Sequence, residues 1–165
     1  RSSKHVDVFL GGACNPTTWR ADIAVPLLEA AELAIYNPQR DDWEPWMIKA
    51  EADAKAAARV ILFVIGSETR GIASMVEAAE LIASGRDVVL ALVDIPRGAT
   101  IAGEKLGAAE IKDLNRGRAY LADVAERHGQ TVYRTVLAAV REVVRRCGDL
   151  AQEEGSAIAD PECRT

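Results

Sequence analysis

The sequence has few of the residues that build metal sites, disulfide frameworks or aromatic surfaces. Its 165 residues include three cysteines and two histidines, and 5% of them are aromatic. Cys14, Cys147 and Cys163 have neither the spacing of zinc ligands nor that of a disulfide framework. We therefore expect reduced thiols, a cytoplasmic compartment and no metal ion. We also expect no cofactor, because the chain has no GxGxxG motif and no Walker lysine.

Long apolar runs and an excess of positive charge are also missing. No apolar run approaches the roughly 18 residues that a membrane helix needs, so no membrane partner is expected. The formal net charge is -5, whereas a protein that binds duplex nucleic acid needs a basic face. Arg141, Arg145 and Arg146 gather on one amphipathic segment, where a solvated helix face is the simpler interpretation.

Apolar runs of strand length alternate with longer segments of helical character. Strands are expected at 5–12, 32–39, 59–66, 87–95 and 130–134, and helices at 15–31, 41–58, 67–85, 108–128 and 135–147. This alternation predicts an α/β fold, a flavodoxin-like or Rossmann-like doubly wound parallel sheet of four to five strands with helices on both faces. We expect a single domain over 1–148 and a polar, flexible tail over 149–165.

In such a sheet, ligands bind beyond the carboxyl ends of the strands. The first loop there, "GGACNPTTW", brings glycine backbone and a helix start to this edge, either as a ligand loop or as a tight turn. Trp19 either stacks on a ligand or belongs to the core. The second loop, "YNPQRDDW", offers amide and carboxylate groups beside Trp43, either for a ribose or base or as a turn with Asp42 as helix cap.

The third loop leads into "SETRGIASMVEAAELIASG", which places Glu77 near the start of an apolar helix. The helix dipole favours its ionised form, and apolar neighbours are expected to strip its water, which suits a nucleophile. The alternative is an acid that only complements the dipole. Glu51 or Asp53, on the preceding helix, is the candidate second acid of a carboxylate pair of the kind used at glycosidic carbons.

Four segments together resemble the nucleoside 2-deoxyribosyltransferase family, in its divergent branch: "VFLGGACNP", "YNPQRDDW", "EADAKAAARVILFVI" and "TRGIASMVEAAELIASGRDVVL". The resemblance covers roughly residues 5 to 95. It implies that Glu77 attacks the anomeric carbon of a nucleoside or nucleotide, and that Glu51 handles the nucleobase and its proton. A homo-oligomer is also implied, because neighbouring subunits often complete such sites.

The chain departs from the family pattern at two places. Thr69, Arg70 and Gly71 stand where an aspartate is usual, and Phe9 lacks the aromatic hydroxyl that orients the glutamate. Arg70 is therefore either a phosphate-binding residue for a 5′-monophosphate or an ordinary surface arginine. The alternatives to an N-glycosidic enzyme are a non-catalytic nucleotide-binding module and a structural domain. The predicted substrate-binding residues are Gly11, Gly12, Asn15, Trp19, Asn37, Gln39, Asp42, Trp43, Arg70, Gly71 and Ser74.

Overall fold

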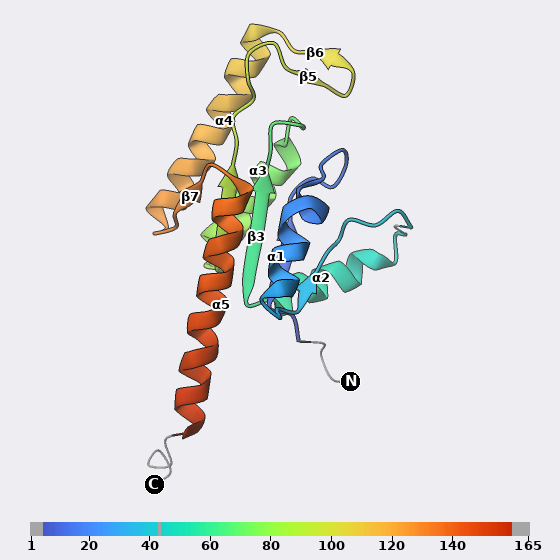
Figure 1. Cartoon of the computed structure of the whole chain (residues 1–165). Helices are drawn as coiled ribbons and strands as arrows, with labels where there is room; N and C mark the ends of the chain where they lie inside the picture. Colours follow the sequence, from blue (N-terminus) through green and yellow to red (C-terminus); the bar gives the residue numbers. More distant parts are fainter. Residues whose placement is uncertain (1–4, 43, 160–165) are drawn as a thin grey trace.

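A five-stranded parallel sheet forms the centre of the protein (Figure 1). The computed structural model describes residues 5–42 and 44–159. The strand order is β2-β1-β3-β4-β7, and every neighbouring pair is parallel. This order confirms the predicted flavodoxin-like arrangement. The strands are β1 (Val8–Gly11), β2 (Ile35–Tyr36), β3 (Val60–Ile65), β4 (Val88–Leu92) and β7 (Val132–Tyr133).

Helices cover both faces of this sheet, as predicted. The α-helices of the described residues are α1 (Val25–Ala30), α2 (Met47–Ala57), α3 (Ile72–Ala83), α4 (Ala108–Arg127) and α5 (Val136–Ala159). Side chains alternate along the strands, so Ile61 and Phe63 of β3 pack with α2, α3 and α4. Leu62 and Val64 face the other way and pack with α1 and α5. The apolar runs of the central strands are continuous because both of their faces are buried.

The first helical segment is irregular near Pro26. A π-helical stretch, η1 (Arg20–Ala24), precedes α1, which has Pro26 in its first turn. Proline has no N–H to donate, so the usual hydrogen bond to the preceding turn cannot form there. The wider turn of η1 accommodates this loss.

The second helix begins later than predicted. α2 starts at Met47 instead of Asp41 or Asp42, and no side chain caps its N-terminus. Asp42 is exposed in a turn, so the interpretation of this residue as a helix cap is wrong. Pro45 shortens the helix, because the residue before a proline is disfavoured in the helical region.

Two features after β4 differ from what the sequence predicts. The loop after β4 contains an antiparallel hairpin, β5 (Thr100–Ile101) and β6 (Glu104–Lys105), which extends beyond the carboxyl ends of the strands (Figure 1). α5 continues to Ala159 instead of ending near residue 147, so the expected tail is helical over 149–159. The rest of that predicted tail, 160–165, lies outside the described residues.

Candidate functional site

The carboxyl edge of the sheet holds a small pocket that joins both predicted catalytic acids. Its volume is about 100 Å³, which is the space of about three water molecules. β1 and its exit turn form one wall, α2 a second and α3 a third. The lining residues are Phe9, Gly11, Gly12, Cys14, Pro38, Glu51, Lys55 and Glu77. The prediction that these segments meet at one edge is thereby confirmed.

Glu77 forms an ion pair with Lys55 in this pocket. The Lys55 Nζ donates a hydrogen bond to Oε1 of Glu77. The same Nζ lies 5.1 Å from the centroid of the Phe9 ring, in a cation–π arrangement. The Glu77 side chain is 40% exposed and that of Lys55 is 21% exposed. The expectation that apolar neighbours strip Glu77 of water is therefore wrong, because the acid is partly exposed and is held by a cation.

Of the two candidates for a second acid, the structure brings Glu51 to the pocket. Glu51 is half-buried and lies one helical turn before Lys55, so both side chains project from the same face of α2. Asp53 is exposed and pairs with Lys49, at 2.9 Å from Nζ to Oδ2. Asp53 is therefore not a member of the carboxylate pair.

The turn after β1 is fixed from beneath by Arg20, which the sequence analysis did not identify. Arg20 is fully buried and donates hydrogen bonds to the carbonyl oxygens of Leu10, Gly12 and Ala13, at 2.8 to 3.3 Å. Burial lowers the pKa of Arg20, and the negative charge of nearby Glu51 acts in the opposite direction. The pocket therefore has a buried cation below its floor.

Gly12 is required for the shape of this turn. Its φ is +107°, and a Cβ at this position would lie 2.1 Å from the carbonyl oxygen of Val64. Any other residue would be strained in this backbone region and would collide with β3. This geometry is that of the tight turn, one of the two interpretations of the first loop, and the role of the turn as a ligand loop stays a prediction.

A second buried arginine fixes the loop before α3. Arg118 of α4 donates to the carbonyl oxygens of Gly66 and Thr69, at 2.9 and 3.1 Å, and its Nε donates to the carbonyl of Val93. Burial lowers the pKa of Arg118. Gly71, with φ +71°, then allows the chain to enter α3. This arrangement sets the position from which Glu77 projects.

Several predicted binding residues stabilise the loops and do not line the pocket. The Gln39 amide donates to the carbonyls of Cys14 and Thr17, at 2.8 and 2.9 Å. Asn37 accepts a hydrogen bond from the Gln39 backbone, which is the geometry of an Asx turn. Trp19 is 7% exposed and packs in the core, so the structure favours the core interpretation for this residue.

Arg70 and Asn15 line a different hollow, of about 420 Å³, between the first and third loops and the hairpin. Arg70 donates to Glu104 at 2.9 Å and to Glu110 at 2.8 Å. These hydrogen bonds raise the pKa of Arg70. The Arg70 guanidinium therefore bonds to Glu104 of the hairpin and to Glu110 of α4. This agrees with the interpretation of Arg70 as a surface arginine. Ser74 is half-buried in the first turn of α3, and Trp43 lies outside the described residues.

The described residues include no cluster of three or more His, Cys, Asp or Glu that could hold a metal ion. Cys14 and Cys147 are free thiols. No described helix combines the length and the apolar character that crossing a membrane requires.

The chain was compared with known proteins. No curated protein is significantly similar to it. A family model described as "nucleoside 2-deoxyribosyltransferase like" matches residues 5–95, which is more than half of the chain. The match covers β1 to β4 and all residues of the pocket that carries Glu51, Lys55 and Glu77. The chain therefore belongs to the nucleoside 2-deoxyribosyltransferase-like family.

Proposed function

We propose that this protein cleaves or transfers the N-glycosidic bond of a nucleoside or nucleotide, with Glu77 as the nucleophile. The observation that carries this proposal is the meeting of Glu77, Glu51 and Lys55 in one pocket at the carboxyl edge of the sheet. Membership of the family supports a nucleoside-type ligand. The two acids come from different helices, α2 and α3, so that one can act on the sugar and the other on the base.

In the first step, an oxygen of Glu77 attacks C1′ of the sugar. The C1′–N bond breaks, its electron pair goes to the base nitrogen, and a glycosyl ester forms on Glu77. In the second step, water or an acceptor base attacks C1′ and releases the carboxylate. A hydrolase uses water in this step, and a transferase uses a second base.

Glu51 is the proposed acid for the departing base. It is half-buried in the same pocket, and the described residues include no hydrogen-bond partner for its carboxylate. Glu51 is proposed to deliver a proton to the base nitrogen as the glycosidic bond breaks. The resulting carboxylate can then take a proton from the attacking water or acceptor base.

Lys55 is the proposed positioning residue for Glu77. Its Nζ fixes one carboxylate oxygen and leaves the other without a hydrogen-bond partner among the described residues. The Phe9 ring lies beneath the ammonium group and limits its movement. The chain therefore has a cation orienting the glutamate beside an aromatic ring that carries no hydroxyl group.

The size of the pocket restricts where the base can lie. About 100 Å³ is below the range of about 300 to 1,000 Å³ that is usual for small-molecule sites, so the pocket would hold only part of a nucleoside. The base is therefore proposed to extend toward Pro38 and the 37–42 loop, beside Glu51. Gly11 and Gly12 then form the wall next to the sugar.

A non-catalytic nucleotide-binding module is the second candidate function. It is favoured by the ion pair itself, because Lys55 reduces the negative charge that Glu77 presents to an electrophilic carbon. It is also favoured by Phe9, which cannot donate a hydrogen bond. Such a module would bind the ligand and release it unchanged.

We further propose that the protein is a homo-oligomer in a cytoplasmic compartment. α3 exposes Ile72 and Val76, at 60% and 68%, one turn apart on the helix that carries Glu77. A second copy packed there would bury apolar surface next to the pocket. Light scattering tests the oligomer. The native protein should have the mass of an oligomer, and Val76→Glu should have the mass of a monomer. A monomeric mass for the native protein would contradict the proposal.

The function is tested with a panel of nucleosides and their 5′-monophosphates, with and without an acceptor base, followed by chromatography. Base release in water identifies a hydrolase, and base exchange identifies a transferase. A thermal shift without any product identifies the binding module. Products from none of the compounds would overturn the enzymatic proposal.

The matched control for Glu77 is Glu80 on the same helix. Glu80 is exposed and lies outside the pocket. Glu77→Gln should remove turnover, whereas Glu80→Gln makes the same change of charge and should leave turnover intact. Equal effects of the two substitutions would show that Glu77 is not the nucleophile.

A further inference from the structure

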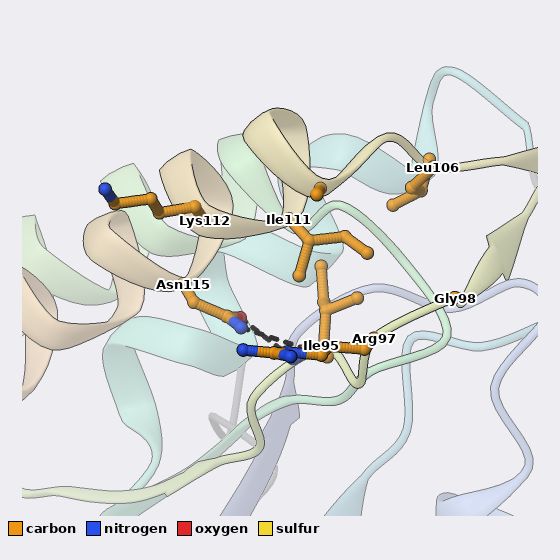
Figure 2. A pocket seen from close by; sticks show the side chains of 8 residues that line it. Ile95, Arg97, Gly98, Leu106, Ile111, Lys112 and Asn115 are labelled. Atoms are coloured by element: carbon orange, nitrogen blue, oxygen red, sulfur yellow. Dashed lines mark hydrogen bonds between the residues drawn. The ribbon is translucent and has the colours of Figure 1, made fainter.

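A third hollow is lined mainly by residues that follow the family match, with Ile95 at its end. It is formed between the segment that follows β4 and the first half of α4 (Figure 2). Its volume is about 420 Å³, which lies within the range of about 300 to 1,000 Å³ that is usual for small-molecule sites. It shares no lining residue with the pocket of Glu77. The hollow is therefore a separate place on the molecule.

The apolar wall of this hollow is already formed. Ile95, Leu106 and Ile111 are at most 5% exposed and belong to a hydrophobic cluster of their own. Asn115 holds the loop from the helix side: its Oδ1 accepts from the Ile95 N–H at 2.8 Å, and its Nδ2 donates to the Ile95 carbonyl at 2.9 Å. A ligand would not need to order this wall on binding, which lowers the cost of association.

Two cations line the hollow together with the apolar wall. Figure 2 shows Arg97 lying along the loop beside Ile95, and Lys112 extending from α4 on the side away from Ile95 and Ile111. In the described part of the chain, neither Arg97 nor Lys112 makes a hydrogen bond or an ion pair. Arg116, on the same helix, pairs with Asp113. The charged groups that line the hollow are thus both positive, in a chain whose net charge is -5.

We propose that this hollow binds a small organic anion, in which one phosphate or carboxylate group is attached to an apolar body. The apolar body contacts Ile95, Leu106 and Ile111. The anionic group contacts Arg97, whose planar guanidinium can donate two parallel hydrogen bonds, and the exposed ammonium of Lys112 adds a second positive charge at the edge of the hollow. The amide of Asn115 already uses its oxygen and one N–H on the loop, so an uncharged polar ligand would find fewer partners.

The test is an NMR titration of the ¹⁵N-labelled protein with phenyl phosphate. Benzoate is the carboxylate probe, phenol tests the apolar body alone, and inorganic phosphate tests the anion alone. We expect phenyl phosphate or benzoate to shift the amides of 95–98 and 106–115, with an affinity at least about tenfold above those of phenol and inorganic phosphate. Shifts confined to residues around Glu77, or equal binding of phenol, would overturn the proposal.

The Arg97→Gln/Lys112→Gln double variant removes both cations. It should lose at least about tenfold in affinity for the anionic probe that binds. The Arg116→Gln/Arg127→Gln variant removes the same charge from exposed positions of α4 and should bind as the native protein does. Equal loss in both variants would show only a general effect of charge, and undiminished binding in the first would contradict the assignment. Glu77→Gln should leave this titration unchanged.

Discussion

Each edge of the sheet carries a carboxylate next to a basic side chain, but the hydrogen bonds of the two carboxylates differ. At the amino edge, Asp7 is 6% exposed and both of its oxygens are engaged: Oδ2 by the Ala34 N–H at 2.8 Å, and Oδ1 by His5 and Arg59 at 2.7 and 3.3 Å. At the carboxyl edge, one oxygen of Glu77 is held by Lys55. An acid with all its oxygens engaged stabilises the fold, whereas a partly engaged acid can still react.

A hollow lies beside both acids, so a cavity alone does not distinguish them. The amino-edge hollow, of about 570 Å³, contains Cys147 next to Asp7. Burial, together with the negative charge of Asp7, raises the pKa of the Cys147 thiol to about 11. Little thiolate is therefore present at neutral pH, and this edge has no activated nucleophile among the described residues. The two edges differ instead in how many oxygens of the acid are hydrogen-bonded: both in Asp7 and one in Glu77.

The largest expected effect is on catalysis at the carboxyl edge. Glu77→Gln keeps the size of the side chain but removes the nucleophilic oxygen, so kcat should fall by at least about a thousandfold. The melting temperature should change little, because Glu77 is partly exposed. Single-turnover kinetics together with a thermal melt measure both quantities. A large fall in stability would place Glu77 with Asp7 as a structural acid.

The next effect concerns stability at the amino edge. Asp7→Asn should reduce the free energy of unfolding by about 2 kcal/mol at pH 7, because charge-assisted hydrogen bonds are lost. Its activity per folded molecule should not change. Urea unfolding and a turnover assay check the two parts, and lost turnover in the folded variant would contradict this separation of roles.

The same variant has a pH dependence of known sign. Burial raises the pKa of Asp7, but the hydrogen bond from Ala34 and the interactions with His5 outweigh it, so the pKa is lowered from 3.8. The charged form is thus favoured by folding, and its stabilisation is present above about pH 4 and is lost as the pH falls through the folded pKa. The difference in stability between native protein and Asp7→Asn should narrow in strong acid. A difference that stays constant would contradict this.

A smaller effect is expected when Lys55 is changed. Lys55→Met should lower kcat by about tenfold to a hundredfold, because Glu77 loses its orienting partner. Lys55→Arg should restore part of the rate, since a guanidinium can hold the same oxygen. KM should change less than kcat if Lys55 acts through Glu77. A faster Lys55→Met variant would instead mean that the ion pair inhibits the enzyme.

The smallest effect is expected at Arg70. Arg70→Gln removes two exposed ion pairs, to Glu104 and Glu110, and should change the melting temperature little, because solvent screens such pairs. The ratio of kcat/KM for a nucleoside and its 5′-monophosphate should stay the same. A selective loss of the monophosphate reaction would return Arg70 to the role of a phosphate-binding residue.

The sequence predicted the sheet and the edge where the loops meet because both depend on general rules, whereas it left Glu51 and Asp53 open as the acid beside Glu77. Apolar runs define the strands, and the loops after parallel strands share one edge. Lys55 was missed because a lysine on an alanine-rich helix resembles a solvated cation. Its spacing of four residues from Glu51, on the same face of α2, was the available signal.

The two buried arginines were missed for a related reason, although their helical spacing contains a signal. Arg20 occupies the same helical stripe as Ala24 and Leu28, and Arg118 lies between Leu114 and Leu121 in the apolar stripe of α4. A cation in an apolar stripe must find acceptors inside the protein. Which carbonyls it finds depends on tertiary contacts that the sequence does not show.

The hairpin was missed because its turn is atypical. Ala102 and Gly103 both have positive φ, and alanine is rare at such a position. The end of α5 was also placed too early, since Gly148 and the polar residues that follow resemble a helix stop. In the structure, the helix continues through them.

The most direct test of the central claim is the mass of the intact protein after incubation with 2-deoxy-2-fluoroarabinosyl nucleosides. The fluorine slows the release of the sugar more than its capture, so the glycosyl ester should accumulate. The account predicts one added fluoroarabinosyl group, located on Glu77 by peptide mapping and missing in Glu77→Gln but present in Glu80→Gln. Base release without any adduct, or an adduct that persists in Glu77→Gln, would contradict it.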